Sequence, residues 1–411
     1  MSDANNISTL LPVSSVGVFV ENKKLRKDIA SLVDDWRFPR VHIDVSEGNV
    51  NTAIETYKTQ ATHDLIIIET ETIDDSFGDC LEELSAYCTE DTAAIVVGPV
   101  NDVNLYRKLM AIGVSDYLVH PIKKEAIGDV IAAALIERVG TSKSKLVTIL
   151  GAKGGVGTSS IAQAMALGCT EGLKQKTVLL DAAGGASYTA VALGQEPVTT
   201  LKEASRAALA EDKGSMKRML VEVNEHLTLL GSGGDPLLED PIQTDGFENI
   251  LDALLTTFPV VIFDASSASI PIKRALLSRS HKICVVSTPT LSSLRASRTL
   301  IQEIKTLRGG EDEEGLIDFT LNMKGQFAGQ EISKSEAESA LEHKVSKVID
   351  FDPKLFPAAE MDGVKITELK GSEALMANIM DGFTSFLGAK KPQETAKSKG
   401  FFDQILKKVK G

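Results

Sequence analysis

Aromatic residues and cysteines are scarce in this sequence. Aromatic side chains make up 5% of the 411 residues and include a single tryptophan, Trp36, so stacking platforms for nucleic-acid bases are not expected. The four cysteines are Cys80, Cys88, Cys169 and Cys284. No two of them have CxxC spacing, so we expect the reduced thiols of a cytosolic protein.

Long apolar segments are absent as well. No run approaches the ~18 apolar residues of a membrane span. The first residues have neither a basic start nor an apolar core, so no signal peptide is expected. Any contact with a membrane would therefore be made from its surface. The formal charge of −13 argues against a general nucleic-acid binder.

Strand-like and helix-like segments alternate almost throughout, which is typical of parallel sheets covered on both faces. The first cycle predicts a flavodoxin-like domain over residues 12–140. Its strand-like segments lie at 16–20, 40–45, 64–69, 93–98 and 115–120. A short polar linker follows at 138–145.

The second cycle is longer and predicts a larger parallel sheet, within a domain over residues 145–388. Its strand-like segments lie at 145–151, 176–181, 226–231, 260–264, 282–287, 316–322 and 344–349. Residues 389–411 differ from both cycles, because they combine a lysine-rich polar linker with a short amphipathic stretch.

The first domain resembles the receiver domains of response regulators, with degraded motifs. The resemblance implies a phosphate-accepting Asp after the third strand, a Ser or Thr after the fourth and a Lys after the fifth. These positions hold Glu69, Gly98 and His120, and only Glu21 remains of the acidic cluster. The missing lysine removes the cation that would hold a phosphate. We therefore expect an interaction module, with His120 as a surface loop residue, rather than a phosphorylated switch.

A glycine-rich turn follows the first strand of the second domain, in the stretch "KLVTILGAKGGVGTSS" at 145–160. Successive backbone N–H groups in such a turn bind phosphate oxygens, assisted by the dipole of the following helix. Gly154, Gly155 and Gly157 allow the required backbone angles and close approach. Ser159 stands at the hydroxyl position that ligates Mg²⁺. The alternative is a loop that binds nothing and is retained because it folds well.

The turn "AKGGVGTS" resembles the deviant phosphate loop KGGxGK[ST] of the MinD/ParA ATPases. That resemblance implies that Lys153 reaches across a dimer interface to the partner's nucleotide. The family's second lysine, which contacts the phosphates of its own site, is replaced here by Thr158. Ala152 also replaces a usual glycine.

Two later strand ends match the same family. Asp181 ends "VLLD", and Asp264 ends "VVIFD", which matches the strand whose Asp holds Mg²⁺ through water. Asn322 matches an asparagine that contacts adenine. The resemblance therefore implies ATP and Mg²⁺ as ligands. The expected nucleotide contacts are Lys153, Gly154, Gly155, Val156, Gly157, Thr158, Ser159, Ser160 and Asn322. The expected metal contacts are Ser159, Asp181 and Asp264.

The sequence keeps fewer of the residues that the family uses for catalysis than of those it uses for binding. The family reads D-x-D after the second strand, and its second Asp positions the attacking water, whereas this chain has Ala183 there. Positioning and electrostatics carry nearly all of phosphoryl-transfer catalysis. Hydrolysis should therefore be slow or absent, and Lys153, acting across the dimer, is the one candidate for a catalytic role. Binding depends mostly on backbone N–H groups and should survive.

The combination of a degraded receiver-like domain with a MinD-like domain resembles the TadZ/CpaE proteins over residues 12–388. The resemblance implies an ATP-binding, dimeric assembly factor of the Tad (Flp, type IVb) pilus machinery that helps to place the machine at a cell pole. Two alternatives remain open. One is an active ParA-type partition ATPase that acts on DNA, and the other is a response-regulator-type output protein.

The last residues, "GFFDQILKKVKG", divide cleanly when placed on a helix at 100° per residue. The apolar side is formed by Phe401, Phe402, Ile405, Leu406 and Val409, and lysines on the other side are Lys407, Lys408 and Lys410. Residues 390–411 carry a net charge of +5, which leaves −18 on residues 1–389. A basic amphipathic helix on an acidic body predicts peripheral attachment to anionic lipid at the inner face of the cytoplasmic membrane. A helix packed on the protein's own surface, or a disordered basic tail, is the alternative.

Overall fold

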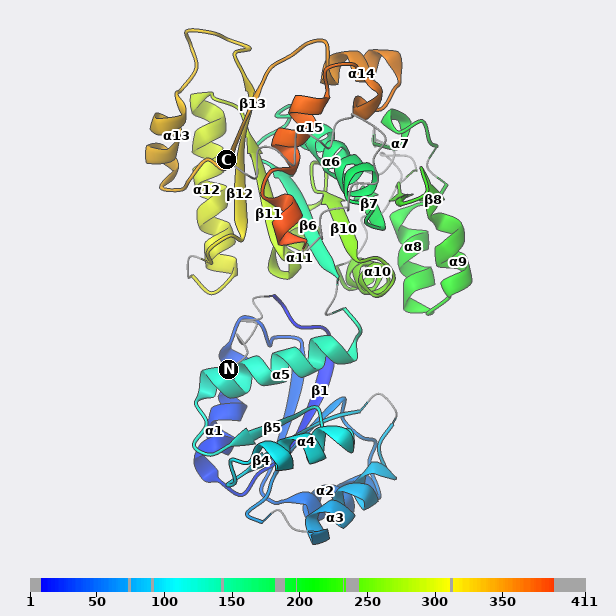
Figure 1. The fold of residues 1–411 in the computed structure, drawn as a ribbon, viewed down its shortest axis with the longest axis vertical. Helices are drawn as coiled ribbons and strands as arrows, with labels where there is room; N and C mark the ends of the chain where they lie inside the picture. Colours follow the sequence, from blue (N-terminus) through cyan, green and yellow to red (C-terminus); the bar gives the residue numbers. More distant parts are fainter. Residues whose placement is uncertain are drawn as a thin grey trace. The chain divides into compact units, whose positions relative to one another are not determined.

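The computed structural model describes residues 9–72, 75–89, 92–141, 144–181, 189–196, 198–231, 233, 244–310 and 313–387. The chain divides into two compact units, residues 1–143 and 144–411 (Figure 1). Within the described ranges no helix is both long enough and apolar enough to span a membrane. The amphipathic tail predicted at 389–411 lies outside these ranges.

The first unit contains a five-stranded sheet with helices on both faces. Its strands are β1 (Ser14–Phe19), β2 (Val41–Ser46), β3 (Leu65–Glu69), β4 (Ala93–Gly98) and β5 (Asp116–Val119). They pair in parallel in the order β2-β1-β3-β4-β5. This is the strand order of flavodoxin-like folds, so the predicted fold class is confirmed.

Two hydrophobic layers hold this sheet between its helices. Its helices are α1 (Lys23–Ala30), α2 (Val50–Tyr57), α3 (Asp75–Ser85), α4 (Val103–Ala111) and α5 (Lys124–Arg138). One layer packs Val16 and Val18 of β1 against α1 and α5. The other packs Phe19 of the same strand against α2 and α3. Successive strand residues point to opposite faces, so β1 contributes to both layers.

The second unit is built on an eight-stranded sheet. Its strands are β6 (Lys145–Gly151), β7 (Thr177–Asp181), β8 (Val221–Glu222), β9 (Leu227–Leu230), β10 (Val260–Asp264), β11 (Lys282–Ser287), β12 (Ile317–Lys324) and β13 (Lys347–Asp350). The order is β13-β12-β11-β6-β10-β7-β9-β8. All pairs are parallel except β8 with β9. The two-residue strand β8 is an addition to the seven predicted strands.

Helices cover both faces of this sheet as well. They are α6 (Thr158–Leu167), α7 (Thr189–Ala192), α8 (Leu201–Leu209), α9 (Lys213–Met219), α10 (Thr244–Thr257), α11 (Ile270–Arg279), α12 (Leu291–Leu307), α13 (Lys334–Leu341), α14 (Phe356–Asp362), α15 (Glu373–Met380) and α16 (Phe383–Phe386). One core layer includes buried residues of α8, α10, α11 and α12, and the other includes α6 and α15. Figure 1 shows α6 running beside β6 and β7.

The parallel direction of these strands gathers four chain segments at one edge. The carboxyl ends of β6, β7, β10 and β11 are Gly151, Asp181, Asp264 and Ser287, and these strands are neighbours in the sheet. Ligands of open α/β sheets bind outside the carboxyl ends of the strands. The predicted phosphate loop and both predicted aspartates therefore reach the same edge.

Candidate nucleotide-binding site

The loop between β6 and α6 follows a path that only glycine accepts at two positions. Gly155 and Gly157 have φ values of 77° and 89°, in the left-handed region that side chains rarely adopt. A Cβ atom on Gly157 would also lie 2.5 Å from Nδ2 of Asn322. That amide donates a hydrogen bond of 2.9 Å to the carbonyl of Val156. The turn is therefore fixed by its own backbone and by the end of β12.

Asn322 thus has a structural contact in addition to the base contact that the sequence predicts. Its side chain is buried and reaches the loop rather than open space. Val156 is also fully buried beneath the loop, whereas Ser160 is half-buried in the first turn of α6. Contact between Asn322 and a nucleotide base stays a prediction.

Thr158, at the position of the missing lysine, is turned inward. The residue is 6% exposed, and a Cβ atom on Gly151 would overlap its hydroxyl oxygen. Thr158 therefore fills the space at the base of the loop, against the last residue of β6. It brings no positive charge to a phosphate bound above the loop.

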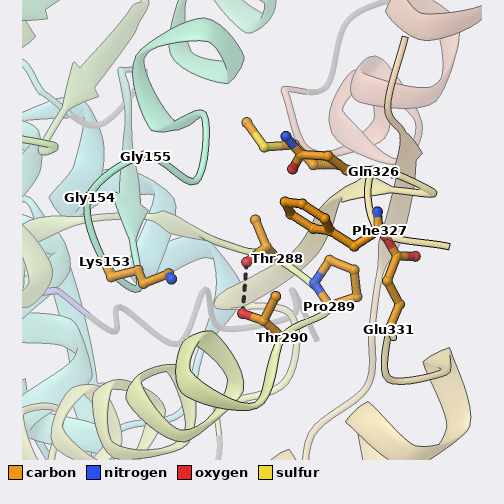
Figure 2. A pocket seen from close by; sticks show the side chains of 10 residues that line it. Lys153, Gly154, Gly155, Thr288, Pro289, Thr290, Gln326, Phe327 and Glu331 are labelled. Atoms are coloured by element: carbon orange, nitrogen blue, oxygen red, sulfur yellow. Dashed lines mark hydrogen bonds between the residues drawn. The ribbon is translucent and has the colours of Figure 1, made fainter. Parts of the chain in front are cut away.

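Lys153, the lysine that remains, lies on the outer side of the loop. Its Nζ atom is 3.4 Å from the hydroxyl oxygen of Ser292, in the first turn of α12. The side chain borders a pocket of about 260 Å³. Figure 2 shows the amino group of Lys153 pointing from the loop towards Thr288 and Thr290 on the turn between β11 and α12.

A turn after β12 forms the opposite wall of the pocket. The carboxylate of Glu331 accepts hydrogen bonds from the backbone N–H groups of Gly325 and Phe327, at 2.8 and 2.9 Å. These N–H donors, first that of Phe327 and then that of Gly325, lower the pKa of Glu331 below its usual value. Phe327 is held at the pocket with 57% of its surface exposed (Figure 2). An aromatic ring presented by a fixed turn is suited to binding, and the sequence analysis missed it.

Buried hydroxyl groups fix the turn between β11 and α12. The hydroxyl groups of Ser287 and Ser293 form a hydrogen bond of 2.8 Å, and the hydroxyl of Ser297 donates to that of Ser287 at 3.0 Å. The backbone N–H of Thr288 donates to Ser293 at 3.1 Å. This network holds Thr288, Pro289 and Thr290 in place beside Lys153.

The predicted metal residues meet at the carboxyl edge of the sheet. Asp264 and Asp181 are register partners on neighbouring strands, and each is 1% exposed. Ser159 donates a hydrogen bond of 3.2 Å to the hydroxyl of Ser266. The N–H of Ser266 donates in turn to Oδ1 of Asp264 at 3.0 Å. Ser159 and Asp264 are thus linked through one residue that the sequence analysis did not identify.

A second hydroxyl approaches the same carboxylate. Thr189, which is almost fully buried, donates to Oδ2 of Asp264 at 3.4 Å. Hydroxyl and carboxylate oxygens suit Mg²⁺, which is commonly held by one or two carboxylates together with water and substrate phosphates. Among the described residues no group of three or more His, Cys, Asp or Glu side chains is placed to hold a metal. A metal here would therefore depend on nucleotide phosphates and water for its remaining ligands.

Some predicted residues lie beyond the described ranges. Ala183 follows β7 within residues 182–188, and the membrane-contact residues lie within residues 388–411. The latter are Phe401, Phe402, Ile405, Leu406, Lys407, Lys408, Val409 and Lys410. Their roles stay predictions from the sequence.

The carboxyl edge of the first sheet holds a different arrangement. Glu69 uses both of its oxygens: Oε1 is 2.6 Å from Nε2 of His120, and Oε2 accepts the backbone N–H of Asn22 at 2.6 Å. His120, which the sequence analysis placed on the surface, is half-buried, with 27% of its side chain exposed. Glu69, His120 and the backbone of Asn22 are therefore hydrogen-bonded to one another at this edge. A receiver domain has a phosphate-accepting carboxylate at the position of Glu69.

No family model matches this chain, and no curated protein matches it. Solved structures do resemble it. A ParA family ATPase from Chlorobium tepidum is 21% identical with a TM-score of 0.50, over 58% of this chain and 98% of that one. This likeness shows the α/β fold of the ParA type, and a match over 58% of the chain is too long for the first unit, residues 1–143, to contain it.

Two further solved structures are similar to parts of the chain. The cell division ATPase MinD from Pyrococcus furiosus is 19% identical, over 59% of this chain and 99% of that one, with a TM-score of 0.48. The pilus assembly protein CpaE from Caulobacter crescentus is 28% identical, over 31% of this chain and 97% of that one, with a TM-score of 0.30.

Proposed function

We propose that this protein is an ATP-binding localisation and assembly factor for a Tad (Flp, type IVb) pilus machine. It acts as a nucleotide-responsive dimer with weak or no ATP hydrolysis. The observation that carries the proposal is the phosphate loop itself. Its glycines and backbone are arranged to bind phosphate, while the position of its phosphate lysine is occupied by the buried side chain of Thr158.

Binding is supported by the parts of the site that do not depend on a lysine. The backbone of Gly154, Gly155 and Gly157 and the first turn of α6 supply N–H donors and a favourable dipole for phosphates. Ser159 and Asp264 supply oxygen atoms suited to Mg²⁺. ATP with Mg²⁺ is the ligand that this combination fits.

Slow hydrolysis follows from two departures in the sequence. Thr158 brings no charge to the phosphates, and Ala183 has no polar atom with which to orient water. Both tasks belong to the positioning and charge stabilisation on which phosphoryl transfer depends. ATP would then act as a ligand that controls assembly rather than as a fuel.

In the proposed dimer, Lys153 of each copy contacts the nucleotide of its partner. The amino group of Lys153 lies on the outer side of the loop, beside Ser292, and borders the same pocket as the exposed ring of Phe327. A cation that borders a pocket together with an exposed aromatic ring fits an interface between two copies of the chain. The assignment to a partner's nucleotide comes from the family resemblance.

The pilus assignment and the location rest on the TadZ/CpaE resemblance and on the basic tail. The tail would hold the protein at the inner face of the cytoplasmic membrane, near a pole, and the receiver-like unit would bind components of the machine. Two tails in a dimer would bind lipid much more tightly than one. Deletion of residues 400–411 should abolish flotation with anionic vesicles, and flotation of the truncated protein would refute the membrane role.

Light scattering of the full-length protein, with and without Mg-ATP, tests the proposal. Mg-ATP should shift the molar mass from monomer to dimer, and Lys153→Ala should abolish that shift. Lys354→Ala, at an exposed lysine on another turn, is the matched control and should dimerise normally. A mass that stays constant in saturating Mg-ATP would reject the nucleotide-controlled dimer.

A further inference from the structure

The loop between β6 and α6 in the second unit has no lysine side chain placed over the position where its own phosphates would bind. Thr158 is packed against Gly151, and the amino group of Lys153 lies beside Ser292 at the start of α12. The backbone of the loop contributes partial charges, but a triphosphate carries several full negative charges. A cation is therefore needed to offset them, and the loop's own side chains do not place one above it.

The neighbouring oxygen atoms are arranged to hold such a cation. Ser159 donates its hydroxyl proton to Ser266, which leaves the lone pairs of Ser159 directed elsewhere. Ser266 uses its N–H to fix Oδ1 of Asp264, and Thr189 approaches Oδ2. Each oxygen of the Asp264 carboxylate is thus oriented by a hydrogen bond. Outer partners of this kind set the direction of metal ligands and raise metal affinity.

We propose that Ser266 is a positioning residue for the Mg²⁺ site formed by Ser159 and Asp264, and that ATP binding to this loop depends strictly on the metal. The inference rests on the proposed nucleotide binding and specifies how it is controlled. Mg²⁺ takes over the charge neutralisation that a phosphate lysine supplies elsewhere. Ser266 ensures that Ser159 and Asp264 act together, because it is bonded to both.

Binding of a fluorescent ATP analogue to the full-length protein, titrated with Mg²⁺, tests this inference. For the wild type, replacement of Mg²⁺ by EDTA should weaken binding about a hundredfold or more. In Ser266→Ala the Mg²⁺ concentration for half-maximal binding should rise about 10- to 100-fold. Ser266→Thr keeps the hydroxyl and should restore the wild-type value.

Ser267→Ala is the matched control, because Ser267 is the adjacent serine and is also exposed. It should leave the Mg²⁺ titration unchanged. Equal titrations of Ser266→Ala and the wild type would overturn the role of Ser266. Equal binding by the wild type in Mg²⁺ and in EDTA would overturn the metal dependence while nucleotide binding stands. Failure of the wild type to bind the analogue even in Mg²⁺ would instead reject the proposed function.

Discussion

The carboxyl edges of the two parallel sheets are equivalent places in the two units, but they are built differently. In the first unit Glu69 is bonded through both oxygens, to His120 and to the N–H of Asn22. In the second unit the same edge carries a glycine-rich loop, an exposed lysine and a linked group of hydroxyl and carboxylate oxygens. The first edge joins an acidic side chain to a histidine and a backbone N–H, whereas the second edge combines a glycine-rich loop with the linked oxygen atoms of Ser159, Ser266 and Asp264.

This difference shows that a doubly wound sheet provides a location rather than a function. The location becomes a phosphate site where the backbone turns its N–H groups outward and glycine allows close approach. It becomes a structural junction where an acidic side chain finds donors inside the protein. Glu69 and Asp264 both end a buried strand and each accepts one backbone N–H. The second partner is the ring of His120 for Glu69 and the hydroxyl of Thr189 for Asp264.

The largest effect that would test this comparison is expected from Gly157→Val. The position has a φ of 89° and adjoins Asn322, so a side chain would be strained and would displace that amide. We expect the free energy of unfolding of the second unit to fall by about 3 kcal/mol, and nucleotide binding to be lost. Hydrogen exchange of peptides from each unit measures the change in stability separately.

Gly154→Ala provides the matched control for stability. A Cβ atom on Gly154 would meet no atom within 4 Å. The substitution should therefore lower the free energy of unfolding much less than Gly157→Val does. If both variants were equally stable, the backbone of the loop would not be under the restraint described here.

Glu69→Gln should have the next largest effect, and it should be confined to the first unit. A glutamine offers one acceptor oxygen and no negative charge, so the carboxylate that meets both the N–H of Asn22 and Nε2 of His120 is lost. The free energy of unfolding of the first unit should fall by about 2 kcal/mol. Trp36 is the only tryptophan and lies in this unit, so its fluorescence during urea unfolding measures the change.

Nucleotide binding by Glu69→Gln should match that of the wild type, because the oxygen atoms of the second unit are untouched. A parallel loss of nucleotide affinity would mean that the two edges are coupled.

Treatment of the wild type with acetyl phosphate should leave the intact mass unchanged. A phosphorylated product would instead support the response-regulator alternative.

A smaller effect is expected from pH through His281. Burial, followed by repulsion from Lys145, Arg308 and Arg279, lowers the pKa of His281 to about 3, and its Nδ1 accepts the N–H of Leu146 at 3.0 Å. The folded protein therefore keeps the ring neutral while the unfolded chain takes up a proton below its usual pKa of about 6.5. Stability is full above that pH and is lost as pH falls towards 3.

The free energy of unfolding of the second unit should thus decrease by about 1 kcal/mol between pH 7 and 5.5 because of this residue. Asparagine places an acceptor near Nδ1 but does not titrate, so His281→Asn should lack this part of the pH dependence. Denaturant unfolding of both proteins at the two pH values gives the comparison. Identical pH dependence would show that His281 is protonated or exposed in the folded protein.

The strands of both units could be predicted because they are short apolar runs between turn residues. In β3 and β10 every residue is buried, so the continuous pattern of a strand covered on both faces was readable. The two-residue strand β8 escaped prediction, because Val221 and Glu222 carry no periodic signal. Its pairing depends on β9, which lies opposite it only in the folded chain.

The residues of the candidate nucleotide-binding site likewise divide into those that the sequence could predict and those that it could not. The loop glycines, Ser159, Asp181 and Asp264 could be found because their signals are local: a glycine-rich turn after a strand, and acidic residues at strand ends. Ser266, Thr189 and Phe327 could not, because serines and threonines are common and a single loop aromatic has no pattern. Their roles follow from atoms far apart in the chain, such as Ser159 and Ser266, that folding brings together.

The sequence by itself determined two parallel α/β sheets, a phosphate-type turn without its lysine and a receiver-like unit without its phosphate-accepting group. Those features are set by residues close together in the chain, through backbone conformation and the pattern of burial. Only the tertiary structure decided that Thr158 is turned inward, that Ser266 links Ser159 to Asp264, and that His120 closes the edge at Glu69. Side-chain partners across strands depend on how the sheet orders its strands, and that order is a property of the whole fold.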